Sequence, residues 1–313
     1  MILVVTHSKD MGADLVIRQL RARGAEYRRL DTDQLGTPAC HAAFDDGPEL
    51  NGWGSRIPAS AIKAVWHRRF AEPAVLASVI PGYRRFAARE LATVFDAFLD
   101  SITGLHVNRH EADRLAGNRL IQAERARAIG FLVPPTLVTQ DPERAGAFIA
   151  AHPVITKALG YGLMDEQTGA SVHTSLVTEP PTLDEARGCP VLLQERVPKR
   201  REWRITTVGQ QIFSARTRHD RDVDPVDWRL SSAPAEIFEP ATLPGAVGRM
   251  TLDLCARSGL AFATHDLIEA PSGDFYFLET NPAGQWGWLE LTIGLPIAAA
   301  LTSLLINADR GSD

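Results

Sequence analysis

Short apolar runs alternate with longer amphipathic stretches over the first hundred residues. Residues 2–5 and 62–66 are mainly apolar runs of the length of a buried strand. Residues 11–23 carry apolar side chains at helical spacing and end before Gly24, a residue typical of the position after a helix. Residues 84–102 predict an amphipathic helix whose apolar face holds Phe86, Val94, Phe95, Phe98 and Leu99. This alternation predicts an α/β domain with a mostly parallel sheet.

A second unit begins near Asn108. Residues 111–130 have a helical pattern that ends at Gly130, and residues 136–139 predict a strand. Asp141, Pro142 and an acidic first turn then predict the start of another helix. Residues 154–157 predict a strand that runs into residues 160–169, a glycine-bearing stretch that we expect to be a flexible loop.

The rest of the chain is rich in predicted strands. Residues 191–194, 203–208 and 211–215 are short apolar or alternating runs, and residues 262–268 and 275–278 predict a hairpin. A closing helix covers residues 289–306, with a bend at Pro296. The predicted class is therefore α/β, with α+β character in the C-terminal part. We expect three domains, at residues 1–107, 108–188 and 189–313.

Composition narrows the class of protein. The chain has 313 residues, of which 45% are hydrophobic and 23% charged, as in globular proteins. The net charge of −5 argues against broad nucleic-acid binding, and no apolar run is long enough to span a membrane. No basic leader with a cleavage site is visible at the start. Three widely spaced cysteines without a CxxC pair argue against a zinc knuckle or a disulfide framework and suit the cytoplasm: Cys40, Cys189 and Cys255. The sequence is compatible with a homo-oligomer and does not define one.

The predicted C-terminal hairpin carries candidate metal ligands. Asp266 near the start of one strand and Glu279 at the end of the other can lie side by side, and Asn281 leaves the same face as Glu279. Two carboxylates that converge with an amide oxygen repel each other unless a hard cation such as Mg²⁺ lies between them. The alternative is a polar strand end followed by an Asn-Pro turn, and the three residues alone do not decide between the two.

Lys157 and residues 194–197 are candidates for binding a nucleotide. Lysine is rare in this chain, and Lys157 ends an apolar strand just before the glycine-bearing stretch, where a phosphate would be a suitable partner. Gln194, Glu195, Arg196 and Val197 end another apolar strand, so their backbone groups could read the edge of an adenine. The alternatives are a surface lysine and an ordinary turn after a strand.

Charged residues gather on the next predicted strand pair. Alternation places Glu202 and Arg204 on one face of a strand, and Arg216 and Arg218 on one face of its partner. Arginines there could bind a carboxylate or phosphate through two hydrogen bonds. We interpret Arg221 and the neighbouring aspartates as a solvated loop, and favour a functional role for Arg204 and Arg218.

These pieces, in this order, resemble the ATP-grasp superfamily, and most of all the graspetide synthetases, which are microviridin-type enzymes that cyclise ribosomal peptides. The most specific likeness is at residues 277–290, which read Phe-Leu-Glu-Thr-Asn-Pro-Ala-Gly-Gln-Trp-Gly-Trp-Leu-Glu. Further likenesses lie at residues 65–69, 118–120, 133–136, 139–142, 202–205 and 227–229. The resemblance implies an ATP-grasp fold over residues 108–300, preceded by a pre-ATP-grasp domain.

The resemblance also implies roles for the candidate residues. Asp266, Glu279 and Asn281 would hold Mg²⁺, and residues 194–197 would line the adenine pocket. Phosphates of ATP would be bound by Lys157 and by Arg119, where the family commonly has a lysine. Arginine keeps that charge but changes the geometry of the contact. Catalytic roles would fall to Glu202, Arg204 and Arg218, with the two arginines facing the acyl-phosphate or the acceptor carboxylate.

The implied activity is an ATP-dependent ligation. Members of this group join Asp or Glu side chains of a precursor peptide to Thr, Ser or Lys side chains, forming ω-esters or ω-amides, and they recognise a leader segment of that peptide. Two alternatives stay open at this point. One is an ATP-grasp ligase that acts on amino acids or on a protein tail, and the other is a nucleotide-binding protein without ligase activity.

Overall fold

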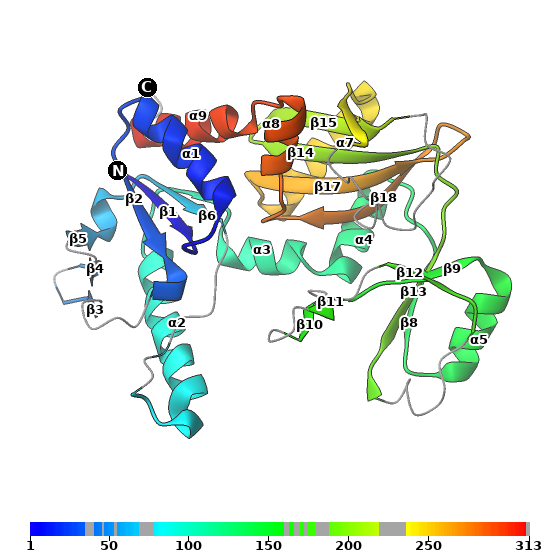
Figure 1. Ribbon diagram of the computed structural model, residues 1–313, viewed down its shortest axis with the longest axis horizontal. Coiled ribbons are helices and arrows are strands. Elements are labelled where there is room, and N and C mark those ends of the chain that lie inside the picture. The colour runs from blue at the N-terminus through cyan, green and yellow to red at the C-terminus, as the bar shows by residue number, and fades with distance from the viewer. Residues whose placement is uncertain are drawn as a thin grey trace.

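The computed structural model describes residues 1–34, 41–45, 47–52, 55–68, 75, 78–159, 163–165, 170–171, 174–179, 188–218 and 236–310. It contains one parallel sheet, an antiparallel central sheet and a larger antiparallel sheet near the C-terminal end (Figure 1). None of the helices in the described ranges combines the length and the apolar character that a membrane span requires.

The N-terminal unit is a layered α/β domain, as predicted. Its four parallel strands run in the order β2-β1-β6-β7. The elements of this unit are β1 (Ile2–Thr6), α1 (Met11–Ala22), β2 (Tyr27–Asp31), β3 (His41–Ala43), β4 (Glu49–Gly52), β5 (Ser55–Pro58), β6 (Ala64–His67), α2 (Arg84–Asp100) and β7 (Leu105–Val107). Asp10 starts α1, because its carboxylate accepts hydrogen bonds from the Gly12 and Ala13 N–H groups. Strands β3 to β5 form a small antiparallel sheet of their own.

Alternate side chains of the parallel sheet enter two different cores. Ile2 and Val4 of β1 pack with α1 and with the C-terminal helix α9 (Ile297–Arg310), whereas Leu3 and Val5 pack with α2. The predicted apolar face of α2 was partly wrong. Phe95, Phe98 and Leu99 are buried in that core, but Phe86 and Val94 are 62% and 44% exposed. At about 100° per residue, Phe86 lies roughly on the opposite side of α2 from Phe95, and Val94 lies at the edge of the buried face.

The central unit begins with two helices where a single one was predicted. Residues 111–130 form α3 (His110–Ala116) and α4 (Arg119–Ile129), and Asn118 separates them. Its side-chain oxygen accepts hydrogen bonds from the Leu120 and Ile121 N–H groups, so this residue starts a new helix. At the other end of α4, Gly130 takes a left-handed φ of 107°, a conformation that favours glycine.

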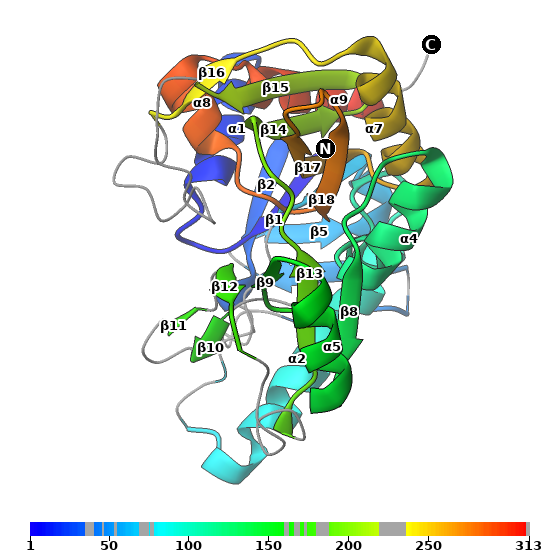
Figure 2. The same ribbon diagram turned by 90° about the vertical axis from the view of Figure 1, so that its right-hand side faces the viewer.

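The central sheet is antiparallel and runs in the order β12-β9-β13-β8. Its elements are β8 (Thr136–Thr139), α5 (Pro142–Ala151), β9 (Val154–Thr156), β12 (Ser175–Val177) and β13 (Val191–Glu195), with the short pair β10 (Leu163–Asp165) and β11 (Ala170–Ser171) beside it. Strand β13 extends the central sheet past residue 188, where we expected the second domain to end. Figures 1 and 2 show this unit projecting below the larger antiparallel sheet.

The C-terminal unit is a five-stranded antiparallel sheet in the order β16-β15-β14-β17-β18. Its elements are β14 (Arg201–Val208), β15 (Gln211–Thr217), β16 (Phe238–Pro240), α7 (Gly245–Ser258), β17 (Phe262–Glu269), β18 (Phe275–Asn281) and α8 (Gly287–Ile293). The predicted hairpin is confirmed as β17 and β18. One face of the sheet packs on α4 and α7 through a core that includes Trp203, Leu267 and Phe277.

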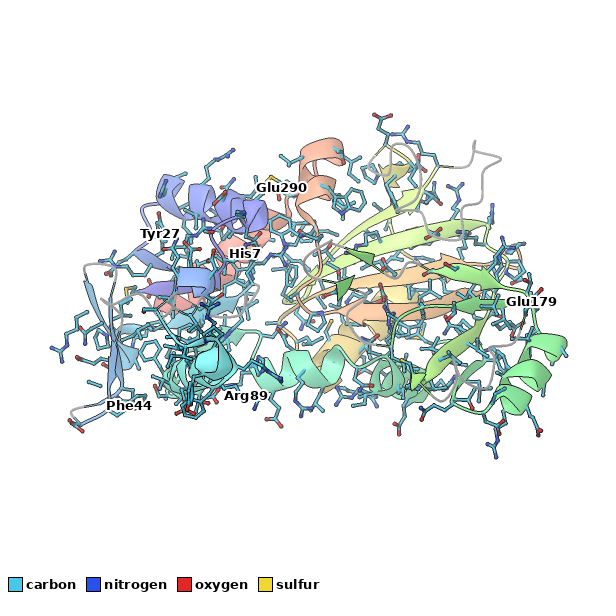
Figure 3. The ribbon with its side chains drawn as sticks, turned by 60° about the horizontal axis from the view of Figure 1, so that its bottom comes forward. His7, Tyr27, Phe44, Arg89, Glu179 and Glu290 are labelled. Atoms are coloured by element: carbon cyan, nitrogen blue, oxygen red, sulfur yellow. The ribbon has the colours of Figure 1, made fainter. Side chains whose placement is uncertain are left out.

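Helix α9 joins the C-terminal sheet to the first domain. Val208 and Phe262 of the five-stranded sheet share a core with Leu301 of α9 and with Trp66 of β6. The predicted closing helix is two helices, because Gly294 takes a left-handed φ of 74° and Pro296 follows it. Glu290 of α8, which is labelled in Figure 3, accepts a hydrogen bond of 2.7 Å from the Ala298 N–H in the first turn of α9.

Candidate functional site

The predicted metal ligands lie on the β17–β18 hairpin. Asp266 is directly opposite Glu279, and Thr264 is opposite Asn281, where the strand ends. The register shifts between Asp266 and Leu267, so that Leu278 is an extra residue on β18. The structure therefore brings the two carboxylates together, and Asn281 lies two residues further along β18.

Arg204 of β14 completes a row across three strands, because it pairs with Asp266 as Asp266 pairs with Glu279. Its Nη1 donates to Asp266 Oδ1 at 2.8 Å, and its Nη2 donates to the Gln285 carbonyl oxygen at 2.7 Å. Arg204 is only 5% exposed. A guanidinium held in this way, beside a partly buried carboxylate, can bind a second anion without reorganising.

Helix α4 contributes charge and support from the other side. Arg119, in its first turn, donates to Glu279 Oε2. Gln122, one turn later, is buried and brackets the Thr280 backbone. Its Nε2 donates to the Thr280 carbonyl oxygen at 2.7 Å, and its Oε1 accepts from the Thr280 N–H at 2.9 Å. Because Thr280 lies between the two predicted ligands of β18, Gln122 fixes the backbone that carries both.

Apolar side chains continue from the charged row toward the junction with the central sheet. Val197 and Ile268 are buried against each other, with Tyr276 and Leu278 packed on them. Gln194 of β13 is buried, and its Nε2 donates to Thr136 Oγ1 at 2.9 Å. The arrangement is apolar at one end and charged at the other, which suits a nucleotide whose base is flat and whose phosphates are anionic.

Residues 195 and 196 end the ladder of the central sheet. The Glu195 N–H donates to the Pro135 carbonyl oxygen at 2.9 Å, and the Arg196 N–H donates to that of Pro153 at 2.7 Å. Glu195 also lies 3.7 Å from His152 Nδ1. Lys157 immediately follows β9, the neighbour of β13. The adenine role of residues 194–197 and the phosphate roles of Lys157 and Arg119 stay predictions.

The remaining predicted catalytic residues are placed differently from one another. Glu202 shares the Arg204 face of β14 and is 2.5 Å from Lys199 Nζ. The strand register pairs Arg216 with Trp203, so Arg216 lies on the opposite face from Arg204. Arg218 follows β15 and is exposed, and its N–H donates to the Ile237 carbonyl oxygen. The structure therefore brings Arg204 to Asp266, and places Arg218 elsewhere.

Two groups of candidate residues lie outside the described ranges. Most of the glycine-bearing stretch at residues 160–169 is one of them, and residues 219–235, with Arg221 and the neighbouring aspartates, are the other. Cys40 and Arg69 also lie outside these ranges.

The oxygen atoms at this site fit a hard cation. Among the described residues, no group of three or more histidine, cysteine, aspartate or glutamate side chains is arranged for a metal ion. A cation bound by Asp266 and Glu279 would therefore also use Asn281 and ligands brought by a substrate. Mg²⁺ is commonly bound in this way, through one or two carboxylates and phosphate oxygens.

A buried polar cluster supports the other face of the hairpin. His265 Nδ1 is 2.9 Å from Thr280 Oγ1, and its Nε2 is within 3.4 Å of both Thr207 Oγ1 and Cys255 Sγ. Burial, with a smaller contribution from the charge of Arg204, lowers the pKa of His265 to about 3. Burial also raises the pKa of Cys255 to about 11, so this pair is neutral and structural.

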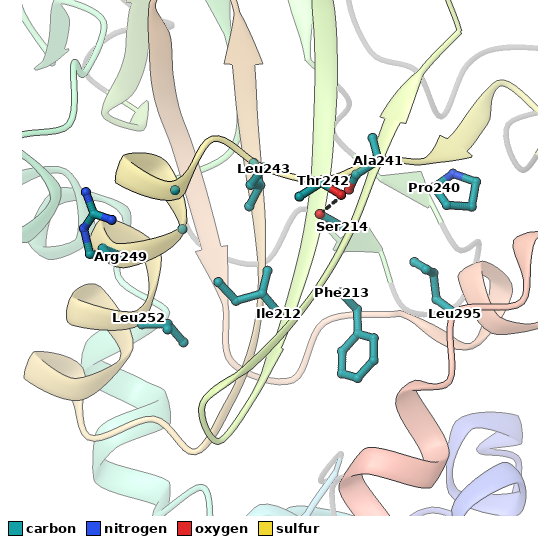
Figure 4. Close-up of a pocket in the computed structure, with 12 residues that line it drawn as sticks. Ile212, Phe213, Ser214, Pro240, Ala241, Thr242, Leu243, Arg249, Leu252 and Leu295 are labelled. Carbon is teal, nitrogen blue, oxygen red and sulfur yellow. Dashed lines mark hydrogen bonds between the residues drawn. The ribbon is translucent and has the colours of Figure 1, made fainter.

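A cavity of about 560 Å³ lies away from the charged row, between α7 and β15 (Figure 4). Ile212 and Phe213 of β15 line it on one side, and Arg249 and Leu252 of α7 line it on another. Ser214, also in the lining, donates to the Ala241 carbonyl oxygen. The walls are mainly apolar, with one arginine at the rim.

Comparison with known proteins agrees with this architecture. Residues 1–114 match the family model of the MvdD pre-ATP-grasp domain. Macrocyclase MdnC from Microcystis aeruginosa MRC, whose structure was solved bound with precursor peptide MdnA, is 29% identical in sequence to this chain. It has a TM-score of 0.83, over 98% of this chain and 99% of that one. Over nearly its whole length the chain thus has the architecture of these ATP-grasp ligases and macrocyclases.

Two further solved structures support this assignment. A RiPP-associated ATP-grasp ligase from Chryseobacterium gregarium, in complex with ADP and a leader and core peptide, is 26% identical. Its TM-score is 0.85, over 99% of this chain and 97% of that one. Macrocyclase MdnB from Microcystis aeruginosa MRC is 28% identical with a TM-score of 0.80, over 97% and 98% of the two chains. No curated protein matches the sequence. The predicted ATP-grasp fold with its pre-ATP-grasp domain is thus confirmed.

Sequence reasoning did not single out Gln122, and treated Arg68 only as part of a resembling motif. Gln122 contacts a residue 158 positions away, and the partners of Arg68 are 215 and 217 positions away. Neither contact follows from spacing along the chain. The signals available in the sequence were a polar residue within a predicted helix, at Gln122, and a charged residue directly after an apolar strand, at Arg68.

Proposed function

We propose that this enzyme activates Asp or Glu side chains of a ribosomally made precursor peptide with ATP and joins them to Thr, Ser or Lys side chains. The products are ω-esters or ω-amides that close rings in the peptide. The observation that carries the proposal is the row Arg204–Asp266–Glu279 across three strands of an ATP-grasp sheet. Support for a peptide as the substrate comes from MdnC and the Chryseobacterium ligase, both of which are complexes with peptides.

Asp266, Glu279 and Asn281 would hold Mg²⁺, which neutralises charge on the phosphates of ATP when it is bound. Residues 194–197 and the apolar side chains beside them would hold the adenine. Lys157 and Arg119 would bind phosphates. The Arg119 guanidinium lies beside Glu279, so it is well placed to share a phosphate with a cation there.

The reaction would have two steps. A substrate carboxylate oxygen attacks the γ-phosphorus of ATP, the bond from that phosphorus to the β–γ bridging oxygen breaks, and ADP leaves. A hydroxyl oxygen or amine nitrogen of the same peptide then attacks the acyl carbon, and phosphate leaves as the nucleophile loses its proton. Arg204 would orient the carboxylate through paired hydrogen bonds and stabilise the acyl-phosphate, so positioning supplies most of the catalysis.

The cavity between α7 and β15 is a candidate for the leader segment of the peptide. Its apolar walls and its volume suit a few apolar side chains of a peptide, and Arg249 offers a charge at the rim. The lining residues lie mainly on β15, on α7 and between β16 and α7, whereas the charged row lies on β14, β17 and β18, so leader and reacting side chains would be held at separate places.

We propose that the enzyme works in the reducing cytoplasm, where ATP and newly made peptide are both available. The two cysteines within the described ranges, Cys189 and Cys255, are free thiols.

The decisive experiment incubates the full-length protein with ATP, Mg²⁺ and a Thr- and Glu-rich peptide encoded beside its gene. Mass spectrometry should show the loss of one water from the peptide for each bond formed, together with ADP. Omission of ATP is the control. A gain of amino-acid mass would instead favour a ligase for amino acids or protein tails, and ADP release without any change in the peptide would refute the proposal.

A further inference from the structure

Arg68 is a buried charge in the first domain that the proposed reaction does not yet use. Its side chain is fully enclosed, at the C-terminal end of β6. Its Nη1 donates to the Ala283 carbonyl oxygen at 2.6 Å, and its Nη2 donates to Gln285 Oε1 at 3.0 Å. Both partners belong to the segment that directly follows Asn281. A buried guanidinium needs such partners, because leaving it unpaired would be costly.

The first domain holds Arg68 in place through Asp10. Asp10 Oδ2 is 3.5 Å from Arg68 Nε and also accepts a hydrogen bond from Thr6 Oγ1 at 2.8 Å. Burial raises the pKa of Asp10, but the charge of Arg68 and hydrogen bonds from Thr6 and the start of α1 outweigh it, and the pKa is lowered. A Cβ on Gly12 would lie 3.1 Å from Asp10 Oδ1 and 3.3 Å from the Arg68 guanidinium, so a glycine in the first turn of α1 leaves room for this pair.

The segment at residues 283–285 is held from three sides. A Cβ on Gly284 would lie 1.8 Å from Thr264 Oγ1, so only glycine allows this approach to β17. Arg68 binds the residues before and after Gly284. The Gln285 carbonyl oxygen in turn accepts from Arg204 Nη2, whose other branch binds Asp266. A chain of direct contacts thus runs from Asp10 in the first domain to Asp266 in the candidate site.

We infer that Arg68 is a positioning residue for the ligation: it fixes residues 283–285 so that the Gln285 carbonyl oxygen holds Arg204 in the orientation that binds the substrate carboxylate. The role of Arg204 in this inference rests on the proposed function. The first domain then sets the geometry of the reaction from behind the catalytic sheet, without touching substrate.

The geometry distinguishes this role from a simple contact between domains. Arg23, at the end of α1, also crosses from the first domain to the C-terminal part, and its Nη1 donates to Ser303 Oγ of α9 at 2.7 Å. Arg23 is exposed, and its partner is in a helix outside the charged row. Arg68 contacts Gln285, which in turn contacts Arg204 of the candidate site. Among the described residues Arg23 has no such link, so it is a matched control for the loss of an arginine at the domain boundary.

The test compares the full-length wild type with Arg68→Lys, Arg68→Gln, Gln285→Leu, the double variant Arg68→Gln/Gln285→Leu, and Arg23→Gln. Lysine keeps a charge beside Asp10, so Arg68→Lys should stay folded. Its single ammonium group cannot bind both partners of the guanidinium, so the contact with residues 283–285 is weakened. Hydrogen exchange of residues 282–288 is measured without substrate. The kcat and KM for peptide-dependent ADP release and the Kd for ADP are measured on the same samples.

We expect exchange in residues 282–288 to accelerate at least about tenfold in both Arg68 variants, as on loss of a charge-assisted hydrogen bond, and to stay unchanged in Arg23→Gln. In both Arg68 variants the kcat should fall by roughly 10- to 100-fold, because Arg204 is misplaced, while the Kd for ADP is unchanged. The effects of Arg68→Gln and Gln285→Leu should not add, since they break the same contact.

Wild-type exchange in residues 282–288 of folded Arg68→Lys, or a wild-type kcat in that variant, would overturn the inference. A wild type that forms no ADP with any peptide would refute the proposed function instead. Hydrogen exchange would then still decide whether Arg68 holds the segment.

Discussion

Asp266 and Glu279 face each other across a strand pair, and each is bound by an arginine from a different element. These pairs compensate the charge of two adjacent carboxylates. The contact between Asp266 and Glu279 was predictable, because a hairpin fixes which residues are opposite. Their arginine partners were not, since Arg119 is 160 residues from Glu279 and is one of many arginines in the chain.

Removing either β18 ligand should abolish the ligation. We expect Glu279→Ala and Asn281→Ala each to lower kcat/KM for peptide-dependent ADP formation by at least about 100-fold, because charge on the transferring phosphoryl group loses its stabilisation. Asp274→Ala is the control, since Asp274 is an exposed residue at the turn of the same hairpin. Near wild-type turnover in both ligand variants would contradict the metal assignment.

Asp113 should make the folded protein less stable as the pH rises from about 4 to about 6. Burial raises the pKa of Asp113 to about 6 from 3.8, although its hydrogen bond from Asn108 acts in the opposite direction. The native state therefore keeps a proton that the unfolded chain has released, and stability is lost as pH rises between about 4 and 6.

Asp113→Asn removes this titration while keeping an acceptor for Asn108. Its free energy of unfolding in urea should match the wild type near pH 4 and exceed it by up to about 3 kcal/mol near pH 8. An equal difference between the two proteins at both pH values would show that Asp113 is not the titrating group.

At the scale of elements, periodic patterns predicted most strands and helices and a bend at Pro296, whereas the break between α3 and α4 was missed. Residues 111–130 were predicted as one helix, because the apolar spacing continues through Asn118. The competing signal was the Asn118 side chain, which accepts hydrogen bonds from two N–H groups of a new helix. The exposed Phe86 of α2 shows another limit. At about 100° per residue, Phe86 lies roughly half a turn around the helix from Phe95, so it faces away from the buried side.

The connection between β18 and α8 depends on Gly284. Gly284→Ala should displace the segment from Thr264, since the added Cβ would overlap the threonine side chain. We expect a loss of about 1–3 kcal/mol in stability and a clear fall in kcat, measured by urea unfolding and by ADP formation. Gly82→Ala is the control, because a Cβ there meets nothing within 4 Å. Unchanged stability and kcat in Gly284→Ala would show that the connection is not held as described.

At the scale of the whole molecule, α9 ties the first domain to the catalytic sheet. Leu301 is fully buried in a core that includes Trp66 of the parallel sheet and Phe262 of the antiparallel one. The central unit has its own small core, around Ala145, Val154 and Leu193. No sequence pattern predicted the contact of α9 with both sheets, because the apolar face of a C-terminal helix does not reveal which sheet it will cover.

Leu301→Ala should therefore destabilise both of these domains together. We expect a loss of about 2–5 kcal/mol, seen as one earlier unfolding transition in which the parallel and five-stranded sheets lose structure at the same urea concentration. Leu291→Ala, at a residue that is 68% exposed, should change stability by no more than about 0.5 kcal/mol. Hydrogen exchange that increases in only one of the two sheets would contradict a shared core.

The arginine contacts of the two carboxylates also bear on the order of binding. A divalent cation that arrives alone must compete with Arg119 and Arg204 for Glu279 and Asp266, and its affinity is reduced by the cost of separating those pairs. A nucleotide brings anionic oxygens that can take over the guanidinium groups as the cation takes the carboxylates. We therefore expect metal and nucleotide to bind as one complex, and Mg²⁺ alone to bind only weakly to the enzyme without nucleotide.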